Sequence, residues 1–228
     1  MTNRILIAIF ALFSALCAEP YSAYSNDAIM KKNPNGGANL DIAKLYEYSD
    51  ALCKHACEYP LKFDSEDEAE QGYNDSMLMA SVFEYINKEI ITDKIDAKDR
   101  TQFDMKFAQI YVSQHNFDVL GAKEKADAIY ERILARDSQN AEVLTTYGEF
   151  LLNSTRTDKA KEILSRATTL GAKRPYLALA AIELMNQNNA KGIEYLEIYC
   201  AEFKDDEKAK TTLEGLKSGD IIIEKIER

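Results

Sequence analysis

The side chains best suited to metal or redox chemistry gather at Cys53, His55 and Cys57. Thiolate and imidazole groups are common zinc ligands, and two nearby thiols can form a disulfide. On a helix, Cys53 and Cys57 share a face, while His55 projects about 200° around the axis from Cys53. The three groups therefore cannot converge on one ion while the helix is intact. The spacing also differs from thioredoxin-type C-x-x-C and from haem-binding C-x-x-C-H, so we predict no metal and no cofactor.

The state of the cysteine pair is left open by the sequence. Cys53 and Cys57 are either reduced thiols on the core side of a helix or a disulfide made near the helix end, before Pro60. Residues four apart on a helix have Cα atoms about 6 Å apart, which is within disulfide range. A thiol redox or metal-carrying protein is the alternative function that this pair would serve. Cys200 has apolar neighbours at helical spacing and is predicted to be a core residue.

Other catalytic arrangements are not found in the sequence. His55 and His115 are the only histidines, which restricts acid–base catalysis. No phosphate-binding glycine loop follows a predicted strand, and no serine lies in a nucleophile elbow. Five acids between Asp64 and Glu70 lack the glycine turn of a calcium loop, and they fit the first turn of a helix instead. We therefore assign no catalytic residue and expect no enzyme activity.

The composition indicates a folded, acidic chain. Its 228 residues are 46% hydrophobic and 29% charged, as in ordinary soluble domains. There are 38 acidic and 28 basic residues, which gives a net charge of −10. Because such a surface repels phosphate groups, we expect no nucleic-acid partner.

The first 18 residues differ from the rest of the chain. Arg4 is their only charge, and an apolar run extends from Ile5 to Leu16, as in a signal peptide. The run is shorter than the ~20 residues that a helix needs to cross a bilayer. We therefore predict cleavage after Cys17 or Ala18 and a periplasmic or secreted protein. The alternative is a lipoprotein anchored to the membrane through Cys17, although the residues before this cysteine fit such a site poorly.

The elements that carry these residues are predicted to be helices. Residues 19–39 contain Pro and Gly without an apolar period, so they are predicted to form a flexible leader. From residue 40 onward, apolar residues recur at intervals of three and four. Residues 40–100 are therefore predicted to be a helical N-terminal segment, whose first helix holds the cysteine pair and ends before Pro60. Ser65 and Glu68 form a capping box that predicts the start of the next helix.

A repeat of 34 residues follows this segment. When residues 107–140 are set against 141–174, four identities fall in one block: Lys125, Ala126, Ile129 and Arg132 match Lys159, Ala160, Ile163 and Arg166. In the second unit, large and small residues alternate along both helices at Leu144, Tyr147, Gly148, Leu151, Ala160, Leu164 and Ala167. This pattern resembles the tetratricopeptide repeat family. A third unit is predicted over 175–205, and residues 206–228 are predicted to form a C-terminal cap.

The resemblance implies the fold and a binding surface. It implies an all-α, right-handed α-solenoid of about three tetratricopeptide-like helical hairpins, with residues 107–205 forming the repeats. In this family the first helices line a groove that binds a peptide or a partner helix. Carried over to this chain, the groove residues are Tyr111, His115, Asp118, Thr145, Glu149, Asn153, Tyr176, Glu183 and Asn186. Because acids stand where related domains place basic residues, we expect a ligand with Lys or Arg, or a neutral strand or helix.

These patterns together predict an exported protein–protein interaction scaffold or assembly factor. The partner is expected to be another protein, with contact to a membrane only if Cys17 is lipidated. A narrower alternative comes from the stretch Tyr147-Gly148-Glu149-Phe150-Leu151. This stretch resembles one in tetratricopeptide pilotins of type IV pili, which would make the chain a pilotin-like lipoprotein for pilus or secretion-system assembly.

Overall fold

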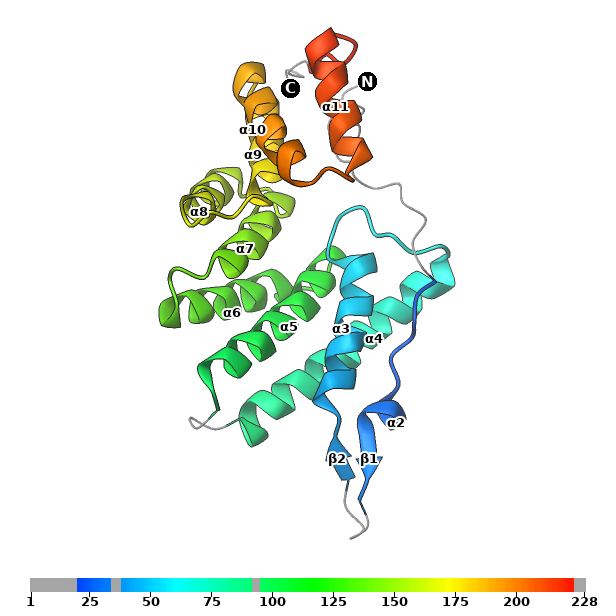
Figure 1. The fold of residues 1–228 in the computed structure, drawn as a ribbon. Helices are drawn as coiled ribbons and strands as arrows, with labels where there is room; N and C mark the ends of the chain where they lie inside the picture. Colours follow the sequence, from blue (N-terminus) through cyan, green and yellow to red (C-terminus); the bar gives the residue numbers. More distant parts are fainter. Residues whose placement is uncertain (1–19, 34–37, 92–94, 224–228) are drawn as a thin grey trace. The chain divides into compact units, whose positions relative to one another are not determined.

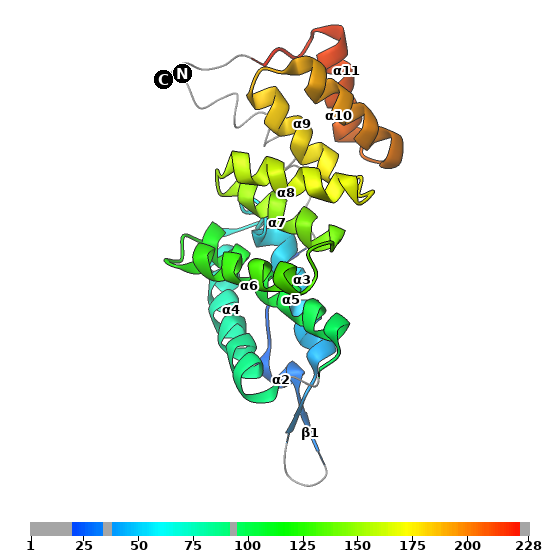
Figure 2. The same ribbon diagram turned by 90° about the vertical axis from the view of Figure 1, so that its left-hand side faces the viewer.

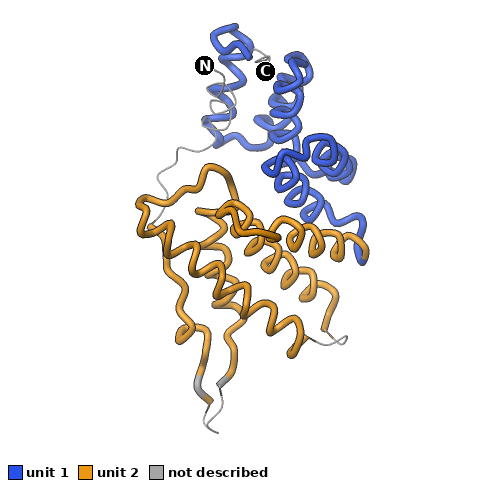
Figure 3. The backbone as a smooth tube through the Cα atoms, turned by 180° about the vertical axis from the view of Figure 1, so that it is seen from behind, with its two compact units in different colours: residues 1–15, 136–228 blue, residues 16–135 orange. Residues whose placement is uncertain are grey.

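A computed structural model describes residues 20–33, 38–91 and 95–223 of the chain (Figure 1). The predicted signal peptide, including Cys17, lies outside these residues. The chain divides into an N-terminal unit within residues 16–135 and a C-terminal unit that begins at residue 136 (Figure 3).

The N-terminal unit is built mainly from helices. Its elements are α2 (Asn26–Ile29), β1 (Met30–Lys32), β2 (Ala38–Leu40), α3 (Ile42–Ala56), α4 (Glu66–Tyr85), the π-helix η1 (Ile86–Ile90), α5 (Ala97–Asn116) and α6 (Ala122–Arg136), the last of which ends at the unit boundary. The two short strands pair antiparallel, with Met30 opposite Leu40. Every other element of the described chain is helical, so the fold is all-α apart from this strand pair.

The predicted flexible leader is wrong for the part of it that the structure describes. Residues 20–33 and 38–40 contain α2 and both strands, and Ile29 is only 1% exposed. The buried carboxylate of Asp75 on α4 holds this segment in place. It accepts hydrogen bonds from the Tyr24 backbone N–H at 2.7 Å and from the Tyr21 hydroxyl at 2.8 Å. Contacts with a distant helix stabilise this segment. It can therefore be ordered without an apolar period in its own sequence.

Aromatic side chains form the core between α4 and α5. The ring of Phe83 lies 5.1 Å from the ring of Phe103 and 5.4 Å from that of Phe107, measured between centroids. Leu45 and Leu52 of α3 are completely buried. Close aromatic pairs of this kind stabilise a core beyond the burial of their area.

The predicted start of α4 is confirmed. The hydroxyl oxygen of Ser65, the N-cap, accepts a hydrogen bond from the Glu68 backbone N–H at 3.1 Å. The Glu68 carboxylate reaches back to the Asp64 backbone N–H at 3.2 Å. The acidic cluster therefore caps and begins a helix, where the helix dipole favours negative charge.

The C-terminal unit consists of helices packed as hairpins. Its helices are α7 (Ala141–Asn153), α8 (Thr157–Thr169), α9 (Pro175–Met185), α10 (Asn189–Glu202) and α11 (Glu207–Ser218). α7 pairs with α8 and α9 pairs with α10, while α8 packs on α9 and α11 packs on α10 (Figure 2). None of the helices within the described ranges is both long enough and apolar enough to span a membrane.

Small residues let the two helices of each hairpin approach closely. A Cβ atom added to Gly148 on α7 would lie 2.5 Å from Leu164 of α8. One added to Gly192 on α10 would lie 2.6 Å from Leu184 of α9. The alternation of small and large side chains noted in the sequence therefore reflects direct helix–helix contact.

The first helix of each hairpin ends in the same turn. Asp118, Thr155 and Gln187 adopt positive φ angles of 60°, 63° and 62°. The following N–H bonds back to the carbonyl five residues earlier, at 2.9 Å each, in the pairs Val119–Gln114, Arg156–Leu151 and Asn188–Glu183. This is the Schellman end of a helix. The shared turn therefore shows which residues of the first helices correspond to one another, independently of the sequence comparison.

Candidate protein-binding surfaces

The cysteine pair forms a disulfide, which is one of the two alternatives that the sequence leaves open. Cys53 and Cys57 are bridged, and their Cα atoms are 4.6 Å apart. Cys57 is the C-cap of α3, so the bridge lies at the helix end. His55 is only 3% exposed, and its ring lies 5.2 Å from that of Phe63 and 5.4 Å from that of Tyr21. Within the described ranges, no group of three or more His, Cys, Asp or Glu side chains could hold a metal ion.

The groove residues predicted on α5 do not form an open surface. Tyr111 is 3% exposed, and its hydroxyl donates a hydrogen bond to the Glu84 carboxylate on α4. Lys125 of α6 lies 4.9 Å from the centre of the Tyr111 ring. Burial, followed by the hydrogen bond to Glu84 and the charge of that residue, raises the pKa of this tyrosine. The prediction for Tyr111 is wrong because its buried side chain contacts α4 and α6. His115 is half-buried, and Asp118 is exposed in the turn after α5.

One of the three residues predicted on α7 is also buried. Thr145 is 4% exposed, and its hydroxyl donates to the Ala141 carbonyl of the same helix at 2.7 Å. It is therefore not available to a ligand, and its prediction is corrected. Glu149 and Asn153 are partly exposed. Asn153 has no side-chain hydrogen-bond partner within the described part of the chain, so its amide is free to bind a ligand.

The prediction for α9 is wrong at Glu183. This residue is 5% exposed, and its carboxylate binds Lys161 of α8 at 2.6 Å and Asn188 at 2.9 Å. The Lys161 ammonium group, which donates a hydrogen bond to the carboxylate, lowers the pKa of Glu183. Tyr176 is half-buried, with its ring 5.4 Å from that of Tyr195, and Asn186 is exposed at the end of the helix.

The predicted attraction of a basic ligand is not supported, because Glu149 and Glu183 already have basic partners within the chain. Glu149 receives two hydrogen bonds from the Arg174 guanidinium, one of them at 2.8 Å. Glu183 is paired with Lys161. An acid that is already bidentate with arginine or buried against lysine offers little net charge to a ligand. The electrostatic part of the ligand prediction is therefore corrected.

The shared turn also changes which residues of α9 correspond to those of α7. Thr155 and Gln187 occupy the same position in the turn and are 32 residues apart rather than 34. Glu149 and Asn153 therefore correspond to Ala181 and Met185 rather than to Glu183 and Gln187. All four are partly exposed, and each pair is spaced i, i+4 along one helix face. We name these four residues the α7–α9 strip.

The sequence contained a signal for Ala181 and Met185. The small residue of the second helix shifts by 32 positions, from Ala160 to Gly192, instead of 34. Applying the same shortened period to the first helix would have selected these two residues. The strip that results contains one neutralised acid, one free amide and two apolar side chains.

Comparison with known proteins identifies the repeat. Residues 121–182, which include all of α6, α7 and α8 and most of α9, match the family model described as tetratricopeptide repeat. The chain therefore contains tetratricopeptide sequence within an all-α helical-repeat fold. Repeats of this type generally mediate binding between proteins. A search of curated proteins and a search of solved structures gave no match to the chain.

Proposed function

We propose that the protein is an exported scaffold or assembly factor that binds a partner polypeptide through the α7–α9 strip. The observation that carries the proposal is the tetratricopeptide match over residues 121–182, together with the packed hairpins of the C-terminal unit. Helical repeats present surfaces made of side chains from successive hairpins. The partly exposed strip spans the first helices of two such hairpins.

The chemistry of the strip favours a neutral or apolar segment of the partner. The Asn153 amide can both donate and accept a hydrogen bond, as an extended backbone requires. Met185 is a flexible, polarizable side chain that adapts to different apolar surfaces. Because Arg174 neutralises Glu149, the affinity is expected to depend only weakly on salt concentration.

Matched alanine-to-glutamate variants test this assignment. Ala181→Glu places a charged, larger side chain in the strip, while Ala201→Glu places the same side chain on the exposed face of α10. A tagged chain is used to capture its partner from the cells that produce it, and the partner's affinity is then measured with each variant. Ala181→Glu should weaken binding at least tenfold, and Ala201→Glu should not. Equal effects of the two changes, or loss of binding with Ala201→Glu alone, would contradict the assignment.

Export is the second part of the proposal. It is supported by the signal-like pattern of residues 1–18 and by the Cys53–Cys57 disulfide, since disulfides persist mainly in oxidising compartments. Determination of the N-terminal residue of the protein isolated from its source tests it. Glu19 or Ala18 at the N-terminus would support ordinary cleavage. A lipid-modified Cys17 would support the pilotin-like alternative, and an intact Met1 would contradict export.

A further inference from the structure

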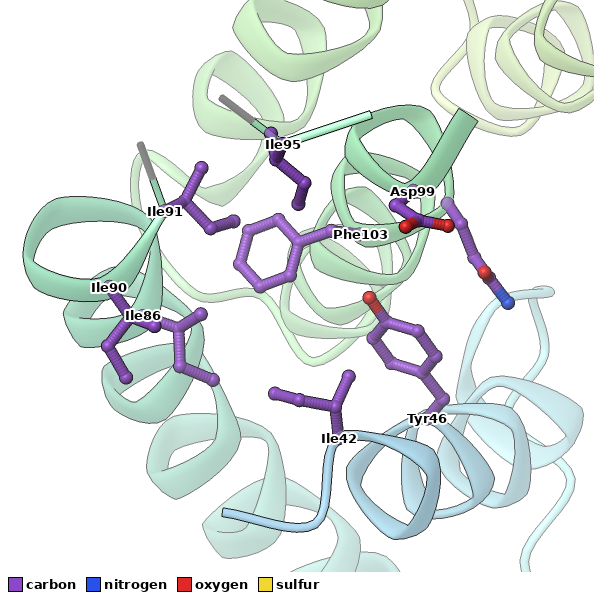
Figure 4. A pocket seen from close by; sticks show the side chains of 9 residues that line it. Ile42, Tyr46, Ile86, Ile90, Ile91, Ile95, Asp99 and Phe103 are labelled. Carbon is purple, nitrogen blue, oxygen red and sulfur yellow. The ribbon is translucent and has the colours of Figure 1, made fainter. Parts of the chain in front are cut away.

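The N-terminal unit contains a pocket that is lined by none of the residues of the α7–α9 strip. Its volume is about 490 Å³, and it lies between the start of α3, the π-helix η1 with the residues after it, and the start of α5 (Figure 4). Most of its wall is apolar and consists of Ile42, Ile86, Ile90, Ile91, Ile95 and Phe103. Pockets of about 300–1,000 Å³ with mainly apolar walls and a few polar groups are typical of ligand sites.

A π-helical turn shapes one side of this pocket. In η1 the Ile91 backbone N–H bonds to the Ile86 carbonyl at 2.9 Å, five residues back. Ile86 is 2% exposed and Ile90 is 50% exposed, so this wall extends from the core to the solvent. Single π-turns in proteins occur frequently at functional sites. The turn is therefore an observation independent of the pocket volume.

One edge of the pocket is polar and carries an unneutralised acid. Figure 4 shows the Asp99 carboxylate and the Tyr46 hydroxyl on the same side of the pocket. Asp99 is exposed, and within the described residues its side chain has no hydrogen-bond or ion-pair partner. Burial, followed by the charges of Asp99 and Asp104, raises the pKa of Tyr46 to about 12, so its hydroxyl stays protonated near neutral pH.

Of the charged residues near the pocket that the structure describes, Arg100, Lys88 and Glu89 already have partners. Arg100 lies 5.8 Å from the centre of the Phe103 ring, but its guanidinium binds the buried Asp104 at 3.2 Å. Lys88 and Glu89 of η1 bind each other at 2.7 Å. Among the described lining residues, Asp99 alone is charged. It can therefore attract a cation that approaches the polar edge.

We propose that this pocket binds a segment of a partner polypeptide in which an aliphatic side chain adjoins a lysine or arginine. The aliphatic side chain would lie among the isoleucines, and the cationic group would meet Asp99 and Tyr46. A wholly apolar ligand would bury these polar groups without partners, which is unfavourable. An anionic ligand would be repelled by Asp99 and by the net charge of −10. The identity of the ligand as a polypeptide rests on the proposed function, whereas the chemistry of the pocket does not.

Blocked dipeptides and isoleucine methyl NMR test the proposal on the purified chain. Acetyl-leucyl-lysinamide carries both required groups, acetyl-leucyl-glutamamide with a free side-chain carboxylate reverses the charge, and acetyl-seryl-lysinamide lacks the apolar group. Hexylammonium serves as a ligand of the same chemistry without a peptide. The first dipeptide should shift the methyl signals of the pocket isoleucines, with a dissociation constant about tenfold lower than those of the other two dipeptides.

Two aspartate variants provide the matched control. Asp99 and Asp67 are both exposed acids in the first turn of a helix, on α5 and α4 respectively. Asp99→Asn should remove the preference for the lysine dipeptide over the glutamate dipeptide, and Asp67→Asn should preserve it. Equal effects of these variants, binding of the glutamate dipeptide as tightly as the lysine one, or absence of shifts at the pocket isoleucines would overturn the proposal.

Two further outcomes separate this proposal from the function of the repeats. Binding of hexylammonium without binding of any dipeptide would overturn the polypeptide ligand. If the dipeptides bind the pocket as expected but Ala181→Glu does not weaken partner binding, only the assignment of the α7–α9 strip is contradicted. The pocket and the strip can therefore fail independently.

Discussion

Glu183 is a charged side chain of the C-terminal unit that acts on stability rather than on ligand binding. The residue is buried, and its carboxylate binds both Lys161 and Asn188. A buried carboxylate that lost these partners would be costly, so the pair holds α8 and α9 together. The sequence suggested a ligand-binding acid here because a helix-face pattern does not show which acids are covered by a neighbouring helix.

The Glu183 pair predicts a specific pH dependence. Lys161 lowers the pKa of Glu183 below the ordinary value of 4.5, so the folded chain keeps this group ionised at lower pH than the unfolded chain does. Its stabilising contribution is therefore present at neutral pH and declines as the pH falls from about 5 through the folded-state pKa. Glu183→Gln should lower the free energy of unfolding at pH 7 by about 1.5–3 kcal/mol.

Urea denaturation between pH 7 and pH 3.5 measures this effect. The difference between the wild type and Glu183→Gln should shrink toward the acid end of the range. Glu162→Gln, which changes an exposed acid of α8, should leave the stability nearly unchanged at every pH. A constant difference for Glu183→Gln across the range would show that ionisation of this residue does not contribute.

Gly148 gives a second prediction at the scale of single residues. An alanine gains about 1 kcal/mol of helix propensity over glycine, but its Cβ would lie 2.5 Å from the buried Leu164 side chain. Overpacking of this kind costs about 1–3 kcal/mol, so Gly148→Ala should be destabilising by up to about 2 kcal/mol in thermal or urea unfolding. In a double-mutant cycle with Leu164→Ala, the two changes should be non-additive because the smaller residue removes the clash. A stabilised single variant would contradict the close contact.

At the scale of elements, the ends of the first helices carry backbone strain. Thr155 has a φ angle of 63°, although β-branched residues adopt this conformation rarely. Such residues store about 1 kcal/mol or more, which a glycine releases in part. Thr155→Gly should therefore raise the free energy of unfolding by about 0.5–1 kcal/mol, measured from urea midpoints. Thr157→Gly, two residues later in the first turn of α8, should lower it, and a loss of stability at Thr155 would contradict the turn geometry.

The end of α3 gives a prediction about thiols. With Cys53 and Cys57 bridged, alkylation of the denatured, unreduced chain beyond residue 18 should modify Cys200 alone, and reduction should expose all three cysteines. Mass spectrometry counts the modified sites. The closed loop is short, so reduction should lower the stability by only about 2 kcal/mol. Three modified cysteines before reduction would show that the pair is not bridged.

The accuracy of the sequence-based predictions also varied between elements. The second helices kept their 34-residue spacing between Ala126 and Ala160, because small residues at helix contacts leave a clear pattern. The ends of the first helices did not keep this 34-residue spacing. Asp118 stands eight residues before Ala126, whereas Thr155 stands five residues before Ala160. The sequence pattern could not supply the longer turn after α5, so the predicted groove residues of α5 were out of register. Those of α9 were out of register because the 32-residue shift from Ala160 to Gly192 was not applied to the first helix.

At the scale of the whole molecule, the helical fold could be predicted from periodicity and from the repeat. The segment before residue 40 and the pocket could not, because both depend on contacts between distant parts of the chain. Asp75 binds Tyr21 and Tyr24 from more than 50 positions away, and the pocket collects residues from three separate elements and the loop before α5. Neither feature leaves a local pattern. Both belong to the N-terminal unit, whereas the tetratricopeptide match covers only the end of that unit.

Partner binding through the first helices of the C-terminal unit is the central proposal for the whole molecule. Site-specific photo-crosslinking in the producing cells measures this directly, with the photoreactive residue placed either at Met185 in the strip or at Ala201 on α10. We expect a crosslinked partner protein from Met185 and none from Ala201. A partner captured from Ala201 but not from Met185 would contradict the account.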